Sequence, residues 1–380
     1  MTKDSLNTLY TALKVPELFG RYITNSHIET CFNKLPFQAV SILGYSVQKR
    51  PIYGLKFGTG KTRVLLWSQM HGNESSTTKA LFDCFNGFIS KSKPFQTILN
   101  TCTVFVIPIL NPDGAKAYTR FNANGVDLNR DAQQLSQPES KLLRQVYTDF
   151  KPNYCFNLHG QRTIYNVGTT NVSATLSFLS PSQNSDCDLT ENRISAMAII
   201  SEINALMQTQ IPNGIARYDD TFNLNCVGDT FQSFGVPTLL FEAGHYPNDY
   251  NREHVRRLLF MAIIKGLDVI AKGVNTTNYK RYFSIPENAK CFYDIIIRNA
   301  KIDNSASVLD IGIQYVEKLV DTSIVFVPKI EVISKLDTFY GHKEIDAKHN
   351  TVKIKGDAQP KVYSEIDFVI INNEKIALKP

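Results

Sequence analysis

The sequence predicts an α/β protein, in which helices cover both faces of a mixed, mostly parallel sheet and a C-terminal all-β accessory domain follows. Up to residue 272, near-continuous apolar runs alternate with segments of helical periodicity. This order is expected when parallel strands are buried on both faces. Beyond residue 285, short β-branched runs separated by turn residues replace it. We therefore predict one domain over residues 1–280 and a β-rich domain over 281–380.

The predicted helices and strands of the first domain follow one another in chain order. Residues 1–37 are expected to form a helical, peripheral segment, and two strands on either side of Arg50-Pro51 are expected to form a hairpin. Residues 63–70 are almost entirely apolar and bounded by turn residues, which predicts a buried central strand. The remaining predicted elements are a helix at 75–89, a strand at 102–110, a helix at 138–150, a strand at 153–159, a helix at 190–208, a strand at 236–243 and a helix at 251–272.

The second predicted domain begins after a polar stretch that contains proline. Its runs of β-branched residues alternate with turn residues and show no helical spacing. The predicted strands lie within residues 292–298, 307–316, 322–328, 350–356 and 367–372.

Composition limits the classes of partner. With 43% apolar and 20% charged residues, the chain has the profile of a soluble globular protein. The net charge of +6 comes without a basic run carrying aromatic residues, so we expect no nucleic-acid partner. No stretch approaches the ~18 apolar residues of a membrane span. The polar start lacks the apolar core of a secretory signal, so we expect a cytoplasmic location and no membrane partner. Composition leaves the oligomeric state open.

Three residues predict a metal site. His71 and Glu74 directly follow the predicted buried strand 63–70, and His159 ends the strand 153–159. Ligands of open α/β sheets bind outside the carboxyl ends of such strands. Imidazole and carboxylate suit zinc, and a catalytic zinc site keeps a further position for water. The seven scattered cysteines never form a CxxC pair, which disfavours thiolate ligands. A lone histidine is more often a surface or core residue, but these two share a position at strand ends.

Further charged residues accompany these ligand candidates. Glu242 ends the apolar strand 236–243, where it is either a charge paired at the end of the sheet or a general base. Arg120, Asn129 and Arg130 lie in the turn-rich segment that follows the strand 102–110. An arginine fork binds a carboxylate in a bidentate way, and a second arginine near a metal can stabilise an oxyanion. The alternative for this segment is a solvated charged turn. His245, three residues after Glu242, is a further candidate to line the cleft.

Over residues 40–270 these motifs resemble the M14 metallocarboxypeptidases in content and order. The resemblance is carried by HGNE, NPDG, TRFNANGVDLNRD, NLHGQR and LLFEAG, after a GYSVQKRPIYGLKFG hairpin. It implies an α/β/α sandwich around a mixed sheet. It also implies hydrolysis of a peptide or amide bond next to a free carboxylate, with one zinc ion per chain. The expected cytoplasmic location favours small peptides or recycled cell-wall peptides as substrates.

The resemblance also implies roles for single residues. His71, Glu74 and His159 would be zinc ligands, Glu242 the base, and Arg120 the group that stabilises the oxyanion. Asn129 and Arg130 would recognise the substrate carboxylate. Family peptidases carry a mobile tyrosine more than twenty residues before the base, and the nearest candidate here is Tyr218. The pocket that sets side-chain preference would be bordered by Gly228 and Asp229. Gly160 and Gln161 replace the serine and aromatic residue usual in digestive members, so the preferred residue is not implied.

Two other functions compete with a peptidase. HGNE and the short Glu242-Ala243-Gly244 segment also resemble the aspartoacylase and succinylglutamate desuccinylase branch, which cleaves small N-acyl amino acids. NPDG, GVDLNR and the hairpin favour the peptidase side. A peptidase needs room for several substrate residues, whereas a deacylase has a cleft capped by its C-terminal domain. The third possibility is a non-catalytic binding protein, which the complete set of ligands and base disfavours.

Overall fold

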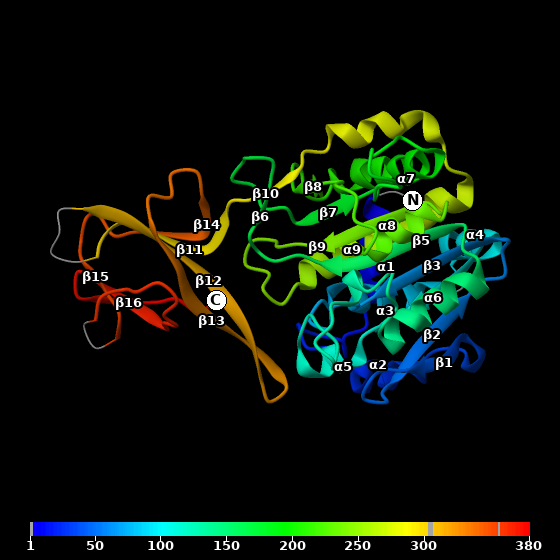
Figure 1. Ribbon diagram of the computed structural model, residues 1–380, viewed down its shortest axis with the longest axis horizontal. Coiled ribbons are helices and arrows are strands. Elements are labelled where there is room, and N and C mark those ends of the chain that lie inside the picture. The colour runs from blue at the N-terminus through cyan, green and yellow to red at the C-terminus, as the bar shows by residue number, and fades with distance from the viewer. Residues whose placement is uncertain (1–2, 91, 303–306, 356–357) are drawn as a thin grey trace.

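The computed structural model describes the chain except for residues 1–2, 91, 303–306 and 356–357. Its main sheet is mixed and has the strand order β1-β2-β4-β3-β5-β9-β7-β8 (Figure 1). The central neighbours β4, β3, β5 and β9 are parallel, while β2 and β7 flank them as antiparallel strands. The strands are β1 (Val40–Tyr45), β2 (Pro51–Phe57), β3 (Thr62–Ser68), β4 (Cys102–Ile107), β5 (Tyr154–Gly160), β7 (Leu176–Leu179), β8 (Ile215–Arg217) and β9 (Thr238–Ala243).

Helices cover both faces of this sheet. The larger core lies between the sheet and a layer that includes α3, α7 and α9, and the smaller core lies beneath α6 and α8. The larger layer contains α1 (Lys3–Leu13), α2 (Asn25–Phe32), α3 (Ser76–Ile89), α4 (Lys93–Thr101), α7 (Glu191–Met207) and α9 (Glu253–Lys272). The smaller layer contains α6 (Pro138–Phe150) and α8 (Val227–Ser233), and α5 (Pro112–Ala117) lies in the loop after β4. Short 3-10 turns occur at Phe37–Ala39, Leu128–Arg130 and Thr276–Ser284.

Strand β3 shows why the apolar runs are nearly continuous. Alternate side chains of a strand point to opposite faces. Val64 and Leu66 pack into the larger core, whereas Leu65 and Trp67 pack into the smaller one, and all four are buried. A strand with helices on both sides has no polar face, so its sequence has no polar alternation.

The C-terminal β region, residues 292–377, contains a four-stranded sheet of order β13-β12-β11-β14 and a three-stranded sheet of order β15-β16-β17. Figure 1 shows the long β12–β13 hairpin reaching from this region to the side of the larger domain near α5. A separate short pair, β10 with β6, lies where the two parts meet. The strands are β6 (Tyr165–Val167), β10 (Asn288–Lys290), β11 (Phe292–Lys301), β12 (Val308–Val320), β13 (Ser323–Ser334), β14 (Tyr340–Asp346), β15 (Val352–Lys353), β16 (Phe368–Ile371) and β17 (Glu374–Ala377).

A buried ion pair fastens the N-terminal segment to the helical layer. The Arg256 guanidinium of α9 donates to both carboxylate oxygens of Asp83 on α3, at 2.6 and 2.7 Å. The same guanidinium donates to the carbonyls of Val15 and Leu18, and the Val15 N–H donates to Asp83 at 2.8 Å. Both charged side chains are fully buried. Each charge therefore depends on the other for compensation of its lost hydration.

The fold class predicted from the sequence is confirmed, both for the mixed sheet between helices and for the all-β C-terminal sheets. Most predicted elements lie within a few residues of the observed ones. The sequence missed α4, α5 and α8 and the strands β6, β7, β8, β10, β14 and β17. The domain boundary at residue 280 stays a prediction, and Gly356 of the predicted run 350–356 lies outside the described residues. No helix in the described part of the chain is long and apolar enough to cross a membrane.

Asp83→Ala should destabilise the protein strongly, because it leaves the Arg256 charge buried without its partner. We expect the free energy of unfolding to fall by about 3–5 kcal/mol, measured by urea denaturation. Glu17→Gln is the matched control, since Glu17 and Lys34 form an exposed pair and its loss should leave the unfolding midpoint nearly unchanged. Equal midpoints for Asp83→Ala and the control would contradict a structural role for the buried pair.

Candidate metal centre and substrate cavity

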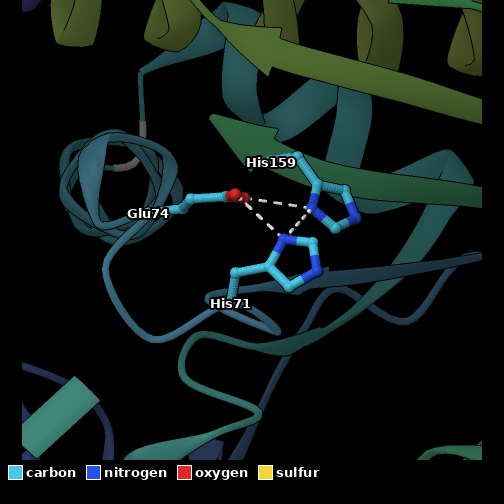
Figure 2. Close-up of side chains that lie close together, drawn as sticks. All are labelled: His71, Glu74 and His159. Carbon is cyan, nitrogen blue, oxygen red and sulfur yellow. Dashed lines mark hydrogen bonds and ion pairs between the residues drawn. The ribbon is translucent and has the colours of Figure 1, made fainter. Parts of the chain in front are cut away.

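The three predicted ligand residues converge at the carboxyl ends of two neighbouring parallel strands. His71 follows β3, Glu74 immediately precedes the first turn of α3, and His159 lies in β5, which pairs with β3. Figure 2 shows the two rings and the carboxylate pointing toward one another. Their candidate ligand atoms all lie within 4.8 Å of one another. The sheet therefore brings together side chains that are 85 and 88 positions apart in the sequence.

Atomic distances show how closely these groups meet. The Nδ1 atoms of His71 and His159 are 3.2 Å apart. One oxygen of Glu74 lies 2.9 Å from His71 Nδ1, and the other lies 3.1 Å from His159 Nδ1. The second oxygen also accepts the Gly160 N–H at 2.9 Å, which orients the carboxylate.

The backbone of the loop between β3 and α3 requires a glycine. A Cβ atom at Gly72 would lie 1.9 Å from the carbonyl carbon of Gly114 in α5. The loop therefore packs directly on the backbone of α5, and any side chain at Gly72 would push it away. This close approach places His71 and Glu74, on either side of Gly72, against the end of β5.

Asp127 is a further candidate residue of the site, and the sequence analysis did not predict it. Its carboxylate lies 3.0 Å from His71 Nε2, the ring nitrogen that faces away from Glu74. Because a carboxylate accepts the proton of one ring nitrogen, the other nitrogen is left with a lone pair for a metal. Asp127 lies in the segment 120–130, two residues before Asn129, and this segment was already singled out from the sequence. No local sequence pattern, however, links Asp127 to a histidine 56 positions earlier.

Electrostatics gives the three candidate ligand groups different protonation states in the absence of a metal. Burial lowers the pKa of His159, so its imidazole is neutral near pH 7. Burial acts in the same direction on His71, but the Glu74 and Asp127 carboxylates raise its pKa to about 9. Burial alone would raise the pKa of Glu74, yet the two imidazoles hold it well below its ordinary value. Near pH 7 the Glu74 carboxylate is therefore ionised and the His159 imidazole is neutral. The His71 imidazole stays protonated as long as it is the cation that neutralises the Glu74 and Asp127 carboxylates.

The donor set fits a zinc ion. Two imidazole nitrogens and one carboxylate are a ligand set of catalytic zinc sites. Two nitrogen atoms at 3.2 Å, both facing the same carboxylate, have room for one shared cation as their common partner. His71, Glu74 and His159 are the residues that would hold it, and Asp127 would support His71 from outside.

Glu242 lies beside this cluster in a fixed position. It is opposite His159 in the parallel pairing of β9 with β5. Among the described residues its Oε2 atom is buried and has no hydrogen-bond partner. Burial, and next the Glu74 carboxylate, raise the pKa of Glu242 well above its ordinary value. A buried carboxyl group with an unused oxygen in a cavity wall is suited to accept a proton there.

The predicted arginine segment also reaches the site. Arg120 donates from Nε and Nη2 to Asp127 at 3.0 and 2.9 Å, and its Nη1 lies 3.3 Å from His71 Nδ1. Asn129 accepts the Val227 N–H through Oδ1 at 2.9 Å, which leaves its amide N–H groups free to donate. Arg130 donates from Nη1 to the Asn129 carbonyl at 2.7 Å and lies 3.2 Å from Cys226 Sγ. No carboxylate of the described residues pairs with Arg130.

The three remaining predicted residues line the same cavity, whose volume is about 480 Å³. Tyr218 packs against Tyr165 with ring centroids 5.4 Å apart, and burial together with the Glu242 carboxylate raises its pKa. Burial raises the pKa of Asp229 to about 6. A Cβ atom at Gly228 would lie 3.1 Å from Pro181, so this position is small because the wall is close. His245 does not line the cavity in the described structure and is buried against His342 instead.

Five further charged residues of the cavity wall were not predicted: Arg21, Arg162, Asp219, Arg252 and Glu317. Arg162 is exposed and lies two residues after β5, the strand that carries His159, and Arg252 is almost fully buried. The Arg252 guanidinium donates to the carbonyls of Ala243 and Gln161, next to the ends of β9 and β5. Arg21 and Glu317 form an ion pair. Arg162 ends the recognised NLHGQR motif, whereas the other four lie outside the recognised motifs.

Comparison with known proteins identifies the sequence family. The zinc carboxypeptidase model of the M14 peptidases matches residues 32–221, half of the 380-residue chain. A probable carboxypeptidase 2 of Arthroderma benhamiae is 25% identical over 126 residues, which cover 33% of this chain and 23% of that protein. Carboxypeptidase E of Caenorhabditis elegans is 29% identical over 141 residues, which cover 30% of each chain. The chain thus spans about a quarter of the length of these curated relatives.

Solved structures support the same fold. A metallo-carboxypeptidase from Burkholderia cenocepacia is 21% identical, with a TM-score of 0.51 over 65% of this chain and 70% of that one. A metallo-carboxypeptidase from Pseudomonas aeruginosa, in complex with (2-guanidinoethylmercapto)succinic acid, is 19% identical, with a TM-score of 0.53 over 67% and 70%. The sequence motifs, the fold and the family match agree, and the chain belongs to the M14 family of zinc carboxypeptidases.

Proposed function

We propose that this protein is a metallocarboxypeptidase, which hydrolyses a peptide or amide bond next to a free carboxylate with one zinc ion per chain. The observation that carries the proposal is the meeting of the His71, Glu74 and His159 cluster with Glu242 in one cavity. A metal-binding cluster alone would also suit a structural site. An adjacent buried carboxyl group with an unused oxygen adds the acid–base partner that hydrolysis needs.

Asn129 and Arg130 are the groups proposed to bind the substrate carboxylate. Asn129 is oriented by the Val227 N–H so that its amide N–H groups are available. Arg130 has guanidinium N–H groups without a carboxylate partner in the described structure. A guanidinium and an amide together offer several donors to one carboxylate. Binding at this point fixes one end of the substrate, and the bond to be cut then lies a defined distance away.

The chain's own residues divide the proposed chemistry. A bound zinc ion supplies Lewis acidity, which polarises a carbonyl and makes water a stronger acid. Glu242 Oε2 is the acceptor for the proton of the attacking water, and the same atom returns a proton to the leaving amine. The Arg120 guanidinium, held in place by Asp127, presents positive charge where the carbonyl oxygen becomes negative.

A second candidate function is cleavage of small N-acyl amino acids. The observation that favours it is that Glu317, from the C-terminal β region, lines the cavity. A cavity closed by another part of the chain suits a small substrate. The same residues would bind the amino-acid carboxylate and perform the hydrolysis, so the two candidates differ in the acyl group rather than in the mechanism.

The proposed function is tested by metal analysis together with a substrate panel. We expect about one zinc ion per purified chain by elemental analysis, because the cluster supplies one set of ligands. We also expect chelator-sensitive release of a C-terminal residue from short peptides. Cleavage of N-acyl amino acids alone would move the assignment to the second candidate. Failure to bind zinc after it is added back would contradict both.

Glu242→Gln should separate proton transfer from metal binding. Because Glu242 lies outside the ligand cluster, zinc content should stay near that of the wild type. The kcat should fall by about 100-fold or more, since the amide cannot accept the proton. Glu202→Gln is the matched control, because it makes the same change at a partly exposed glutamate that does not line the cavity. It should leave kcat unchanged. Loss of zinc from Glu242→Gln would show that its assigned role is wrong.

Asp127→Asn should weaken zinc binding although Asp127 is not a ligand. The amide no longer orients His71 or increases the basicity of its ring, so we expect zinc affinity to fall by about 10–100-fold. Competition with a chromophoric chelator measures this change without reference to turnover. Asp149→Asn, at the exposed end of α6, serves as the control. If both variants bind zinc as tightly as the wild type, Asp127 does not support the site.

A further inference from the structure

One wall of the cavity comes from the C-terminal β region. Among the described residues that line the cavity, Glu317 is the one that this region contributes. It lies on β12, in the long hairpin that extends to the side of the larger domain (Figure 1). The metal-binding cluster and this hairpin are thus parts of one cavity, although residues 71 and 317 are 246 positions apart.

Glu317 is held by two residues from different segments of the larger domain. Its carboxylate oxygens lie 2.8 and 3.0 Å from Arg21 Nη2. The Tyr118 hydroxyl, at the end of α5, donates to the same carboxylate. Arg21 and Tyr118 are both buried, whereas about a quarter of the Glu317 side chain is exposed, at 24%. A partly buried carboxylate with a guanidinium and a hydroxyl as partners has few alternative arrangements.

This contact lies directly beside the ligand cluster. The Arg21 carbonyl accepts the Ser75 hydroxyl at 2.5 Å, and Ser75 follows Glu74 in the chain. The wall at Glu317 and the cluster are therefore linked through Arg21 and Ser75. Asn129 and Arg130 instead contact Val227 and Cys226, and no hydrogen bond of the described residues joins them to Arg21 or Glu317.

The base of the hairpin is fixed at other points. Asp294 on β11 accepts the Gln314 side chain and the Tyr250 hydroxyl, the latter at 3.2 Å, so it joins the β region to the loop before α9. Gln314, on the same strand as Glu317, also donates to Thr163 at 2.6 Å. The hairpin is consequently anchored on both sides of the cavity wall, and it cannot swing away without leaving buried polar groups unpaired.

We propose that the β12–β13 hairpin is a fixed end wall of the substrate cavity, positioned by Glu317, and that it limits the length of the acyl part of the substrate. The inference rests on the proposed function, because that function assigns the carboxylate end of the substrate to Asn129 and Arg130. The Glu317 end of the cavity is then left for the acyl part. A cavity of about 480 Å³ is in the size range of small-ligand sites, which agrees with a short acyl part.

The test is a series of peptides that share one C-terminal residue pair and carry zero, one, two or four further residues before it. For the wild type, kcat/KM should fall as residues are added. In Glu317→Ala the longest peptides should gain about tenfold relative to the shortest, the order expected when a charged hydrogen bond no longer holds the wall. Tyr118→Phe removes one donor only and should shift the same ratio by a smaller factor.

Two controls separate a positioning role from general damage. Glu365→Gln breaks the exposed Lys318–Glu365 pair in the same β region and should leave the length ratio unchanged. Unfolding midpoints show whether Glu317→Ala is folded, and Tyr118→Phe keeps the test valid if it is not. The end-wall proposal would be wrong if the wild type cleaved peptides of all lengths equally. It would also be wrong if the variants kept the wild-type ratio of kcat/KM between long and short peptides. Neither result would contradict the peptidase function.

Binding provides a measurement that does not need turnover. Calorimetric titration of Glu242→Gln with the same peptides should show that short ones bind and long ones do not. Adding Glu317→Ala should restore binding of the long ones. If no peptide is hydrolysed by the wild type but this binding pattern appears, the wall stands and the proposed hydrolysis fails. If peptides of every length bind equally, or none binds, the wall is wrong.

Discussion

The parallel pairing of β3, β5 and β9 is the constraint on which the candidate site depends. It sets His159 opposite Glu242 and brings the loop after β3 to the same edge. A slip of one residue between β5 and β9 would turn one of these side chains to the other face of the sheet. What prevents the slip is apolar packing, since Phe156 and Phe241 are buried in the same core. The polar chemistry is thus positioned by apolar residues that have no chemical role.

The site gathers charges that water would otherwise solvate. Glu74 receives two imidazoles and a backbone N–H, whereas Glu242 keeps one buried oxygen without a partner in the described structure. An unpaired buried polar atom costs free energy, and proteins retain such atoms where they have a use. Asp127 serves both the metal cluster and the arginine, because one oxygen faces His71 and the other accepts Arg120. A single carboxylate therefore couples the orientation of a ligand to that of a cation.

The sequence predicted the parts of the site that lie at strand ends. Buried parallel strands leave a long apolar signal, and the residue that ends such a run is easily placed, as for His159 and Glu242. Asp127 escaped prediction because its loop folds back onto His71 through tertiary packing that has no local periodicity. The position of Glu317 at the cavity could not be predicted either, because a strand pattern gives no information on which distant surface the strand will contact. His245 shows the opposite error, since proximity in sequence to Glu242 did not bring it to the cavity.

The residues of the metal cluster and Glu317, the residue of the end wall, lie on different parts of the fold. The candidate ligands and the proposed base lie at the carboxyl ends of β5 and β9 and in the loop after β3, beside the core of the larger domain. Glu317 lies on a hairpin, and its own contacts with the larger domain are polar, at Arg21 and Tyr118. Changes in such a hairpin alter the shape of the cavity without moving His71, Glu74 or His159. The length of the acyl group can therefore be selected independently of the metal centre, provided that the ion pair continues to hold the hairpin in place.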